Sequence, residues 1–159
     1  MRTMKYKIDS KADTARVSII GALNEQCQTP LQQLVRELAG KVRHVDFDCS
    51  EIDGINSTGV AHWVTMLQDL DKGISYEFSR CSIFFIDYAN LITEITNDAP
   101  IVSFFAPMKC PSCGLSESPL LLTQDVDPVR GFGVVNCSRC KVALISEVDP
   151  SDYLMFLED

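Results

Sequence analysis

Basic residues are scarce in this sequence. Its 159 residues include 14 Lys and Arg against 22 Asp and Glu, which gives a formal net charge of −8. The deficit extends along the chain, because residues 1–108 hold ten basic and fourteen acidic side chains, and residues 109–159 hold four and eight. Binding to DNA or RNA needs clustered Lys and Arg that displace counterions from phosphates. The composition therefore argues against a nucleic-acid partner, including one for the C-terminal segment.

Long hydrophobic runs are also missing. No stretch approaches the ~18 apolar residues of a membrane-spanning helix, and the polar, basic N-terminus is not followed by an apolar run as in a secretory signal. We therefore expect no membrane partner and a cytoplasmic location. The sequence also lacks a glycine-rich phosphate loop, a Ser–His–Asp arrangement and a glycine-flanked nucleophile, which favours a protein that is not an enzyme.

The apolar pattern predicts alternating strands and helices. Helices are expected from a Thr29 cap to Gly40, from Ser57 or Thr58 to about Lys72, and over 87–96. A loop is expected over 50–56, and strands over 6–8, 17–23, 42–49, 74–78 and 101–106, with 81–85 as an extension. This order predicts an α/β fold with a mixed sheet and helices packed on it, in a domain of residues 1–107. Residues 108–159 are expected to form a small β zinc ribbon with a short C-terminal helix.

The seven cysteines fall into two groups. Cys27, Cys49 and Cys81 stand alone and are expected to be small core residues, whereas two Cys-x-x-Cys pairs follow in the last third of the chain, formed by Cys110, Cys113, Cys137 and Cys140. Two intervening residues let both sulfurs of a pair turn toward one point, and two such pairs close a tetrahedron around zinc. Gly114 supplies the backbone freedom that the first tight turn needs.

The two pairs are 23 residues apart, slightly more than the usual spacing, and strand candidates at 120–123 and 132–135 explain the extra length. A third strand is expected at 142–148. We expect a structural zinc ion, because four thiolates leave no open coordination position for catalysis. An iron or iron–sulfur site, a thiol redox pair and unligated cysteines are the alternatives.

The segment Phe47-Asp48-Cys49-Ser50-Glu51-Ile52-Asp53-Gly54-Ile55-Asn56-Ser57-Thr58-Gly59-Val60 ends a strand and opens a helix. It resembles the signature of STAS domains, the family of bacterial anti-sigma factor antagonists, which have an Asp-Ser-Ser-Gly-like turn at the start of a helix. The matching positions are Asn56, Ser57, Thr58 and Gly59. Upstream, Ile20-Gly21-Ala22-Leu23 resembles the family's strand that ends in Gly and a small or acidic residue, and the order of elements over 5–106 agrees.

This resemblance implies a regulatory module that docks onto a protein partner, either a sensor kinase or an anti-sigma factor. In phospho-switching members the Ser or Thr after the acidic residue accepts the phosphate, which here is Ser57, with Thr58 as the adjacent hydroxyl. The family's acidic residue is Asn56 in this chain. Helix capping alone by Asn56 or Ser57 is therefore an alternative. For the whole chain, a constitutive scaffold and a thiol redox protein are the alternatives, and a homodimer stays open.

Overall fold

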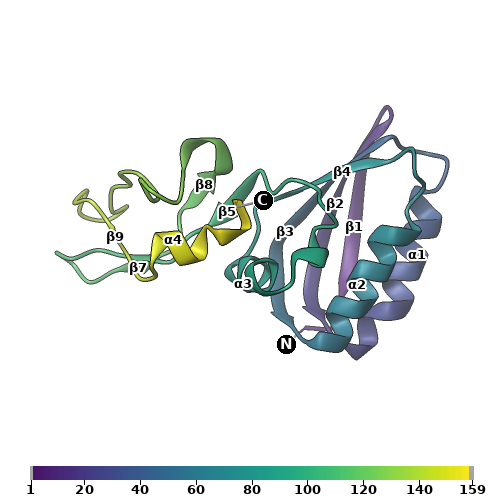
Figure 1. The fold of residues 1–159 in the computed structure, drawn as a ribbon, viewed down its shortest axis with the longest axis horizontal. Coiled ribbons are helices and arrows are strands. Elements are labelled where there is room, and N and C mark those ends of the chain that lie inside the picture. The colour runs from purple at the N-terminus through teal and green to yellow at the C-terminus, as the bar shows by residue number, and fades with distance from the viewer. Residues whose placement is uncertain (1, 158–159) are drawn as a thin grey trace.

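A mixed four-stranded sheet forms the centre of the larger of two lobes (Figure 1). The structure is a computed structural model that describes residues 2–157. Strands β1 (Lys5–Lys11) and β2 (Thr14–Leu23) form the expected hairpin. Strand β3 (His44–Ile55) runs parallel to β2, and β4 (Ser75–Ser79) runs parallel to β3, so the sheet order is β1-β2-β3-β4.

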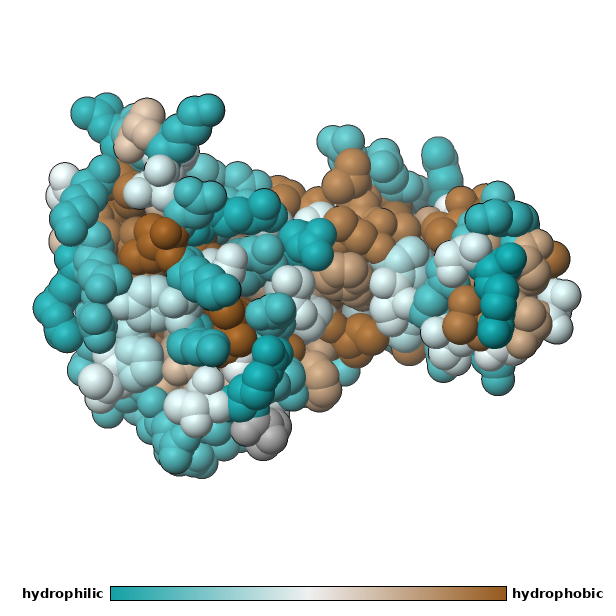
Figure 2. Space-filling view, turned by 180° about the vertical axis from the view of Figure 1, so that it is seen from behind, coloured by the Kyte–Doolittle hydropathy of each residue, from teal (hydrophilic) through white to brown (hydrophobic). Residues whose placement is uncertain are grey.

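Two helices cover one face of this sheet (Figure 1): α1 (Gln28–Leu38) and α2 (Ser57–Asp69). Trp63 of α2 is fully buried, as expected, and its ring meets that of Phe47 edge-on at 5.6 Å between centroids. Its Nε1–H donates to the carbonyl of Ile95 at 2.8 Å, so the polar end of this large side chain is satisfied in the core. The opposite face of the sheet is mostly hydrophilic (Figure 2).

Three expected boundaries in this lobe are wrong. The first helix does not start from a Thr29 cap, because a 3₁₀ turn, η1 (Glu25–Cys27), leads directly into α1, and Asn24 caps that turn by accepting from the Gln26 amide at 2.9 Å. The loop expected at 50–56 is strand as far as Ile55, and Asn56 is the cap of α2. Up to Cys49, every second side chain of β3 is buried. Bulges in the β2–β3 pairing then shift this alternation by one residue, so the pattern that marks a strand is interrupted in the sequence.

The third helix lies earlier than the sequence suggested. Helix α3 spans Ile83–Leu91 and is followed by the 3₁₀ turn η2 (Thr93–Ile95). The Ser82 hydroxyl caps α3 by accepting from the Phe85 amide at 3.3 Å, so the apolar run expected to extend a strand is helical instead. Ile95 is buried as expected, but Leu91 is 77% exposed.

Strand β5 (Ser103–Phe105) connects the two lobes. Isolated parallel bridges join Phe78 to Ile101 and Cys81 to Phe104, and β5 then pairs antiparallel with β8 (Leu120–Leu122). Hydrogen bonding therefore continues from the large sheet into the C-terminal lobe.

The C-terminal lobe also contains a three-stranded sheet of order β7-β6-β9, built from β6 (Met108–Lys109), β7 (Ser116–Glu117) and β9 (Ile145–Ser146). It also contains η3 (Thr123–Asp125), α4 (Pro150–Tyr153) and η4 (Met155–Leu157). The strand expected over 132–135 is absent, since Gly131 and Gly133 adopt φ of +77° and +75°. The strand expected over 142–148 is reduced to β9 and an isolated bridge between Asn136 and Ala143.

An aromatic cluster joins β5 to this lobe. Phe104 packs against Phe132, Tyr153 and Phe156 with centroid distances of 6.3, 6.0 and 5.4 Å. The Tyr153 hydroxyl donates to the Phe105 carbonyl at 2.6 Å, and the Tyr153 carbonyl accepts from the Asn90 side chain at 2.9 Å. None of the helices within residues 2–157 is long and apolar enough to cross a membrane.

Candidate functional site

The two Cys-x-x-Cys segments form matching hairpins. The amide of Cys110 donates to the Leu115 carbonyl and that of Cys137 to the Val142 carbonyl, both at 2.8 Å. Gly114 and Lys141 each follow the second cysteine of a pair, and their amides donate at 3.0 Å to the carbonyls of Cys110 and Cys137. These two residues both have positive φ, +77° and +68°. The same turn is thus built twice, once with a glycine and once with a lysine in the left-handed region.

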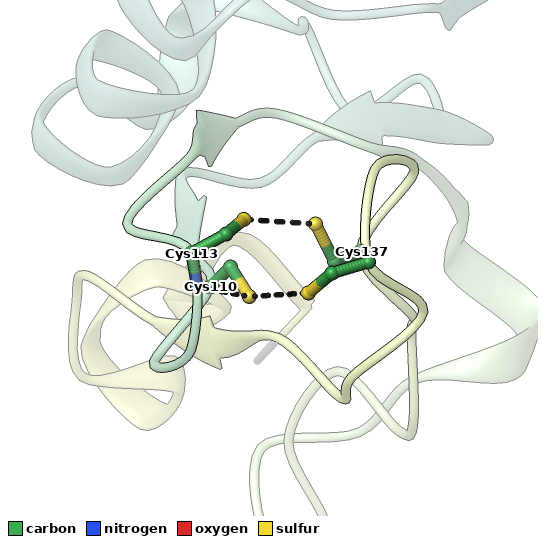
Figure 3. Close-up of side chains that lie close together, drawn as sticks. Cys110, Cys113 and Cys137 are labelled. Atoms are coloured by element: carbon green, nitrogen blue, oxygen red, sulfur yellow. Dashed lines mark hydrogen bonds between the residues drawn. The ribbon is translucent and has the colours of Figure 1, made fainter.

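The hairpins bring the four thiol groups together. All four Sγ atoms lie within 4.8 Å of one another, with Cys110 Sγ 3.3 Å from Cys140 Sγ and Cys113 Sγ 3.6 Å from Cys137 Sγ. Figure 3 shows Cys110 and Cys113 on one hairpin facing Cys137 on the other. A tetrahedral zinc ion with Zn–S bonds of about 2.3 Å holds its sulfurs about 3.8 Å apart. The four cysteines therefore fit a metal ion.

Backbone donors and neighbouring charge favour the thiolate form of Cys110 and Cys113, whereas hydrogen bonding with the neighbouring thiols outweighs the Val142 backbone donor and raises the pKa of Cys140 to about 11. The Cys113 amide lies 3.4 Å from Cys110 Sγ, and the Arg139 amide lies 3.4 Å from Cys137 Sγ. A hydrogen bond from the Leu115 backbone, together with the Arg139 side chain, lowers the pKa of Cys113 to about 6. Amide donors from the Cys113 and Ser112 backbone also lower the pKa of Cys110. Metal ions bind thiolates rather than thiols, so these donors prepare the ligand set.

Two sulfur–sulfur contacts run between the hairpins, from Cys110 to Cys140 and from Cys113 to Cys137. A thioredoxin-like pair would place its two sulfurs side by side within one motif at the start of a helix. Neither hairpin here opens a helix. Cys27, Cys49 and Cys81 lie away from this cluster and are fully buried, as expected for core residues.

The second predicted site lies at the N-terminus of α2, in the other lobe, so the structure does not bring the two sites together (Figure 1). Asn56 is the cap, because its side-chain oxygen accepts from the Gly59 amide at 2.9 Å. Ser57 and Thr58 are exposed in the first turn. Among residues 2–157, the backbone N–H groups of Ser57 and Thr58 meet no protein acceptor, as is usual in a first helical turn.

Gly59 is fixed by packing. A Cβ atom at this position would lie 1.8 Å from the Leu23 carbonyl oxygen and 2.6 Å from the Asn24 nitrogen. The Asn56 amide also donates to the Leu23 carbonyl at 3.1 Å. The start of α2 therefore rests directly on the end of β2, and only glycine permits that approach.

Sequence reasoning missed Glu25. Its carboxylate accepts from the Asn56 side-chain amide at 2.9 Å, so a negative charge lies beside the start of α2 although residue 56 itself is neutral. No local pattern indicates a contact between residues 31 positions apart. Arg2 was missed for the same reason: its Nε lies 2.9 Å from Asp53 Oδ2, and it lowers the pKa of that carboxyl.

Comparison with known structures identifies the fold of the larger lobe. The chain is similar to an anti-sigma factor antagonist from Mycobacterium paratuberculosis, with a TM-score of 0.52 and 15% sequence identity over 62% of this chain and 84% of that one. The anti-sigma factor antagonist SpoIIAA in its unphosphorylated form also matches, with a TM-score of 0.43 and 12% identity over 57% of this chain and 82% of that one. The expected STAS-like α/β fold is therefore confirmed.

No protein-family model matches the chain, and no curated protein shows significant sequence similarity to it.

Proposed function

We propose that this chain is a bacterial regulatory module of the anti-sigma factor antagonist type, which acts by binding a protein partner and not as an enzyme. Residues 1–107 form the docking domain, and residues 108–159 form an appendage held by a structural zinc ion. The partner is an anti-sigma factor or sensor kinase in the cytoplasm. The observation that carries the proposal is the STAS-like fold with a serine and a threonine exposed at the start of α2.

The surface proposed for docking consists of Asn56, Ser57, Thr58 and Gly59. Its backbone is held in place from beneath, because the Gly59 contact with Leu23 and the Asn56 cap leave little freedom at the start of α2. A fixed backbone with exposed hydroxyls suits protein recognition, since little ordering is required on binding.

Phosphorylation of Ser57 is the proposed switch. A phosphate on Ser57 meets the helix N-terminus, where the amides of Ser57 and Thr58 are available as donors. It also adds about −1.5 to −2 charges beside the Glu25 carboxylate. The local surface thus changes from weakly to strongly negative without a change of fold, which releases a partner that fits the unmodified surface.

Zinc is the proposed occupant of the four-cysteine cluster. Four sulfur ligands within 4.8 Å, brought together by two hairpins, match a closed structural site. The strands around it are only two or three residues long, so the ion supplies much of the order in this part of the chain.

A constitutive scaffold is the second candidate, and the Asn56 side chain favours it. Both ends of its amide group are engaged, the oxygen by Gly59 N–H and the nitrogen by Glu25. An Asn held in this way carries no charge and cannot supply the carboxylate that the family has at this position.

Binding of a purified anti-sigma factor from the same organism, measured by calorimetry, separates these functions. Ser57→Asp is expected to weaken binding at least about tenfold (about 1.4 kcal/mol), whereas Ser57→Ala leaves it within a few fold. Ser10→Asp, at an exposed position of β1, adds the same charge away from the start of α2 and serves as the control. If Ser57→Asp and the unmodified protein bind equally and the partner does not phosphorylate Ser57, the switch is excluded and the constitutive scaffold is the function that remains.

A further inference from the structure

One edge of the molecule ends in unpaired strand backbone. Strand β8 pairs with β5 on one side only. The Thr123 amide donates to the Val102 carbonyl, and the Ala106 amide donates to the Pro119 carbonyl. Opposed residues in an antiparallel pair of strands alternate between hydrogen-bonded and non-hydrogen-bonded pairs, so the hydrogen-bonded pair between these two bonds is Phe104 with Leu121. The amides and carbonyls of Leu120 and Leu122 therefore point away from β5. Among the described residues no other strand pairs with these groups, and Leu122 is also the N-cap residue at which the 3₁₀ turn η3 begins.

The side chains along this edge are apolar and exposed. Leu120 is 41% exposed and Leu122 46%, and alternation along the strand places both on one face. Leu120 lies opposite Phe105, which lines a hollow of about 390 Å³ together with Phe84 and Ile52. Figure 2 shows apolar residues gathered where the two lobes join. None of the four basic residues of the C-terminal segment lies in β8, so the strand lacks the charges that usually protect a sheet edge.

Unpaired strand groups are complementary to another extended backbone, and here the pattern is self-complementary. If two copies of β8 pair antiparallel about Leu121, Leu120 of each copy lies opposite Leu122 of the other. The four outward backbone groups of each copy then all find partners, and four leucine side chains meet across the axis. We propose that this chain forms a symmetric dimer through its β8 edge, which joins the two sheets into one.

The dimer is a weak one. Pairing of three-residue strands buries little surface compared with the 1,200 Å² or so of a stable interface, although the apolar surface around Phe105 extends it. Each copy carries a net charge of −8, so the two copies repel each other. Added salt should therefore strengthen the association, because it screens this repulsion. Docking of a basic strand from another protein on the same edge would weaken with salt.

Sedimentation of the zinc-loaded full chain tests the dimer. We expect a monomer–dimer equilibrium with a Kd on the order of 10–100 µM that tightens between low and high salt. Leu122→Lys should weaken it at least about tenfold, since the lysine lies on the edge. Val129→Lys is the matched control, because Val129 is apolar, 95% exposed and outside β8. A monomer up to about 1 mM at high salt, or equal association of both variants, would overturn the proposal.

Hydrogen exchange of individual amides locates the interface. The Leu121 amide, which faces β5, should be protected at every protein concentration. The Leu120 and Leu122 amides should gain protection of about tenfold or more only at concentrations above the Kd. Dimerisation without that gain would place the contact elsewhere and overturn pairing through β8. Neither result bears on binding at the start of α2.

Discussion

Replacing Gly59 by alanine should destabilise the larger lobe strongly. The added Cβ would lie 1.8 Å from the Leu23 carbonyl oxygen and 2.0 Å from its carbon, and both are backbone atoms that cannot rotate away. Non-bonded carbon contacts are comfortable at about 3.5 Å, so the start of α2 must move by well over an ångström. That movement also stretches the 3.1 Å bond from the Asn56 amide to Leu23.

The expected cost follows from these two effects. Steric overpacking costs about 1–3 kcal/mol, and loss of one backbone hydrogen bond costs about 1 kcal/mol. We therefore expect Gly59→Ala to lower the free energy of unfolding by about 3 kcal/mol, a large share of the 5–15 kcal/mol that is typical of a domain.

Urea unfolding followed by circular dichroism measures this change, with an unchanged m value as the sign that only stability has altered. Gly73→Ala is the matched control, because a Cβ there meets nothing within 4 Å and the backbone does not have positive φ. That variant should be neutral or slightly more stable. A loss below about 1 kcal/mol for Gly59→Ala would refute the close approach of α2 to β2.

Three further predictions concern the metal cluster, the alkaline limit and the helix cap. Cys137→Ser should abolish stoichiometric zinc binding and make residues 109–148 sensitive to protease, while helical circular dichroism is retained; one equivalent of zinc in this variant would contradict the four-ligand site. Burial and the hydrogen bond to Glu37 raise the pKa of Tyr6 to about 12. The stabilisation from the hydrogen bond between Tyr6 and Glu37 should therefore be complete below pH 10 and lost toward pH 12. The melting temperature of Tyr6→Phe should fall less steeply over this range than that of the unmodified protein. Asn56→Ala removes the cap bond to Gly59 and should cost about 1 kcal/mol in urea unfolding, with Gln32→Ala, at an exposed position within α1, as the comparison.

The sequence was most informative where chemistry is local. The spacing of Cys110, Cys113, Cys137 and Cys140 predicted that four sulfurs could converge, because a Cys-x-x-Cys turn has one compact geometry. The start of α2 was predicted correctly because Asn56 and Ser57 are strong capping residues. Amphipathic spacing likewise placed Trp63 in the core.

Features that depend on pairing between distant segments were not predictable. The bulges between β2 and β3 change which side chains of β3 face the core after Cys49. The sequence pattern therefore predicted that the strand ends at Cys49, although it is continuous in the structure. The apolar run after the Ser82 cap is compatible with a strand or with a helix. Tertiary packing, which the sequence pattern does not show, determines that it forms helix α3. The Glu25 contact with Asn56 and the pairing of β5 with β8 also require the folded chain.

Intact mass spectrometry of the protein purified from its own host, first native and then denaturing, with mapping of modified peptides, tests the central claim most directly. We expect one zinc ion per chain under native conditions and a fraction that carries phosphate on Ser57. A chain without bound metal would contradict the structural role of the four cysteines. A zinc-loaded chain that never carries phosphate on Ser57 under any growth condition would contradict the switch.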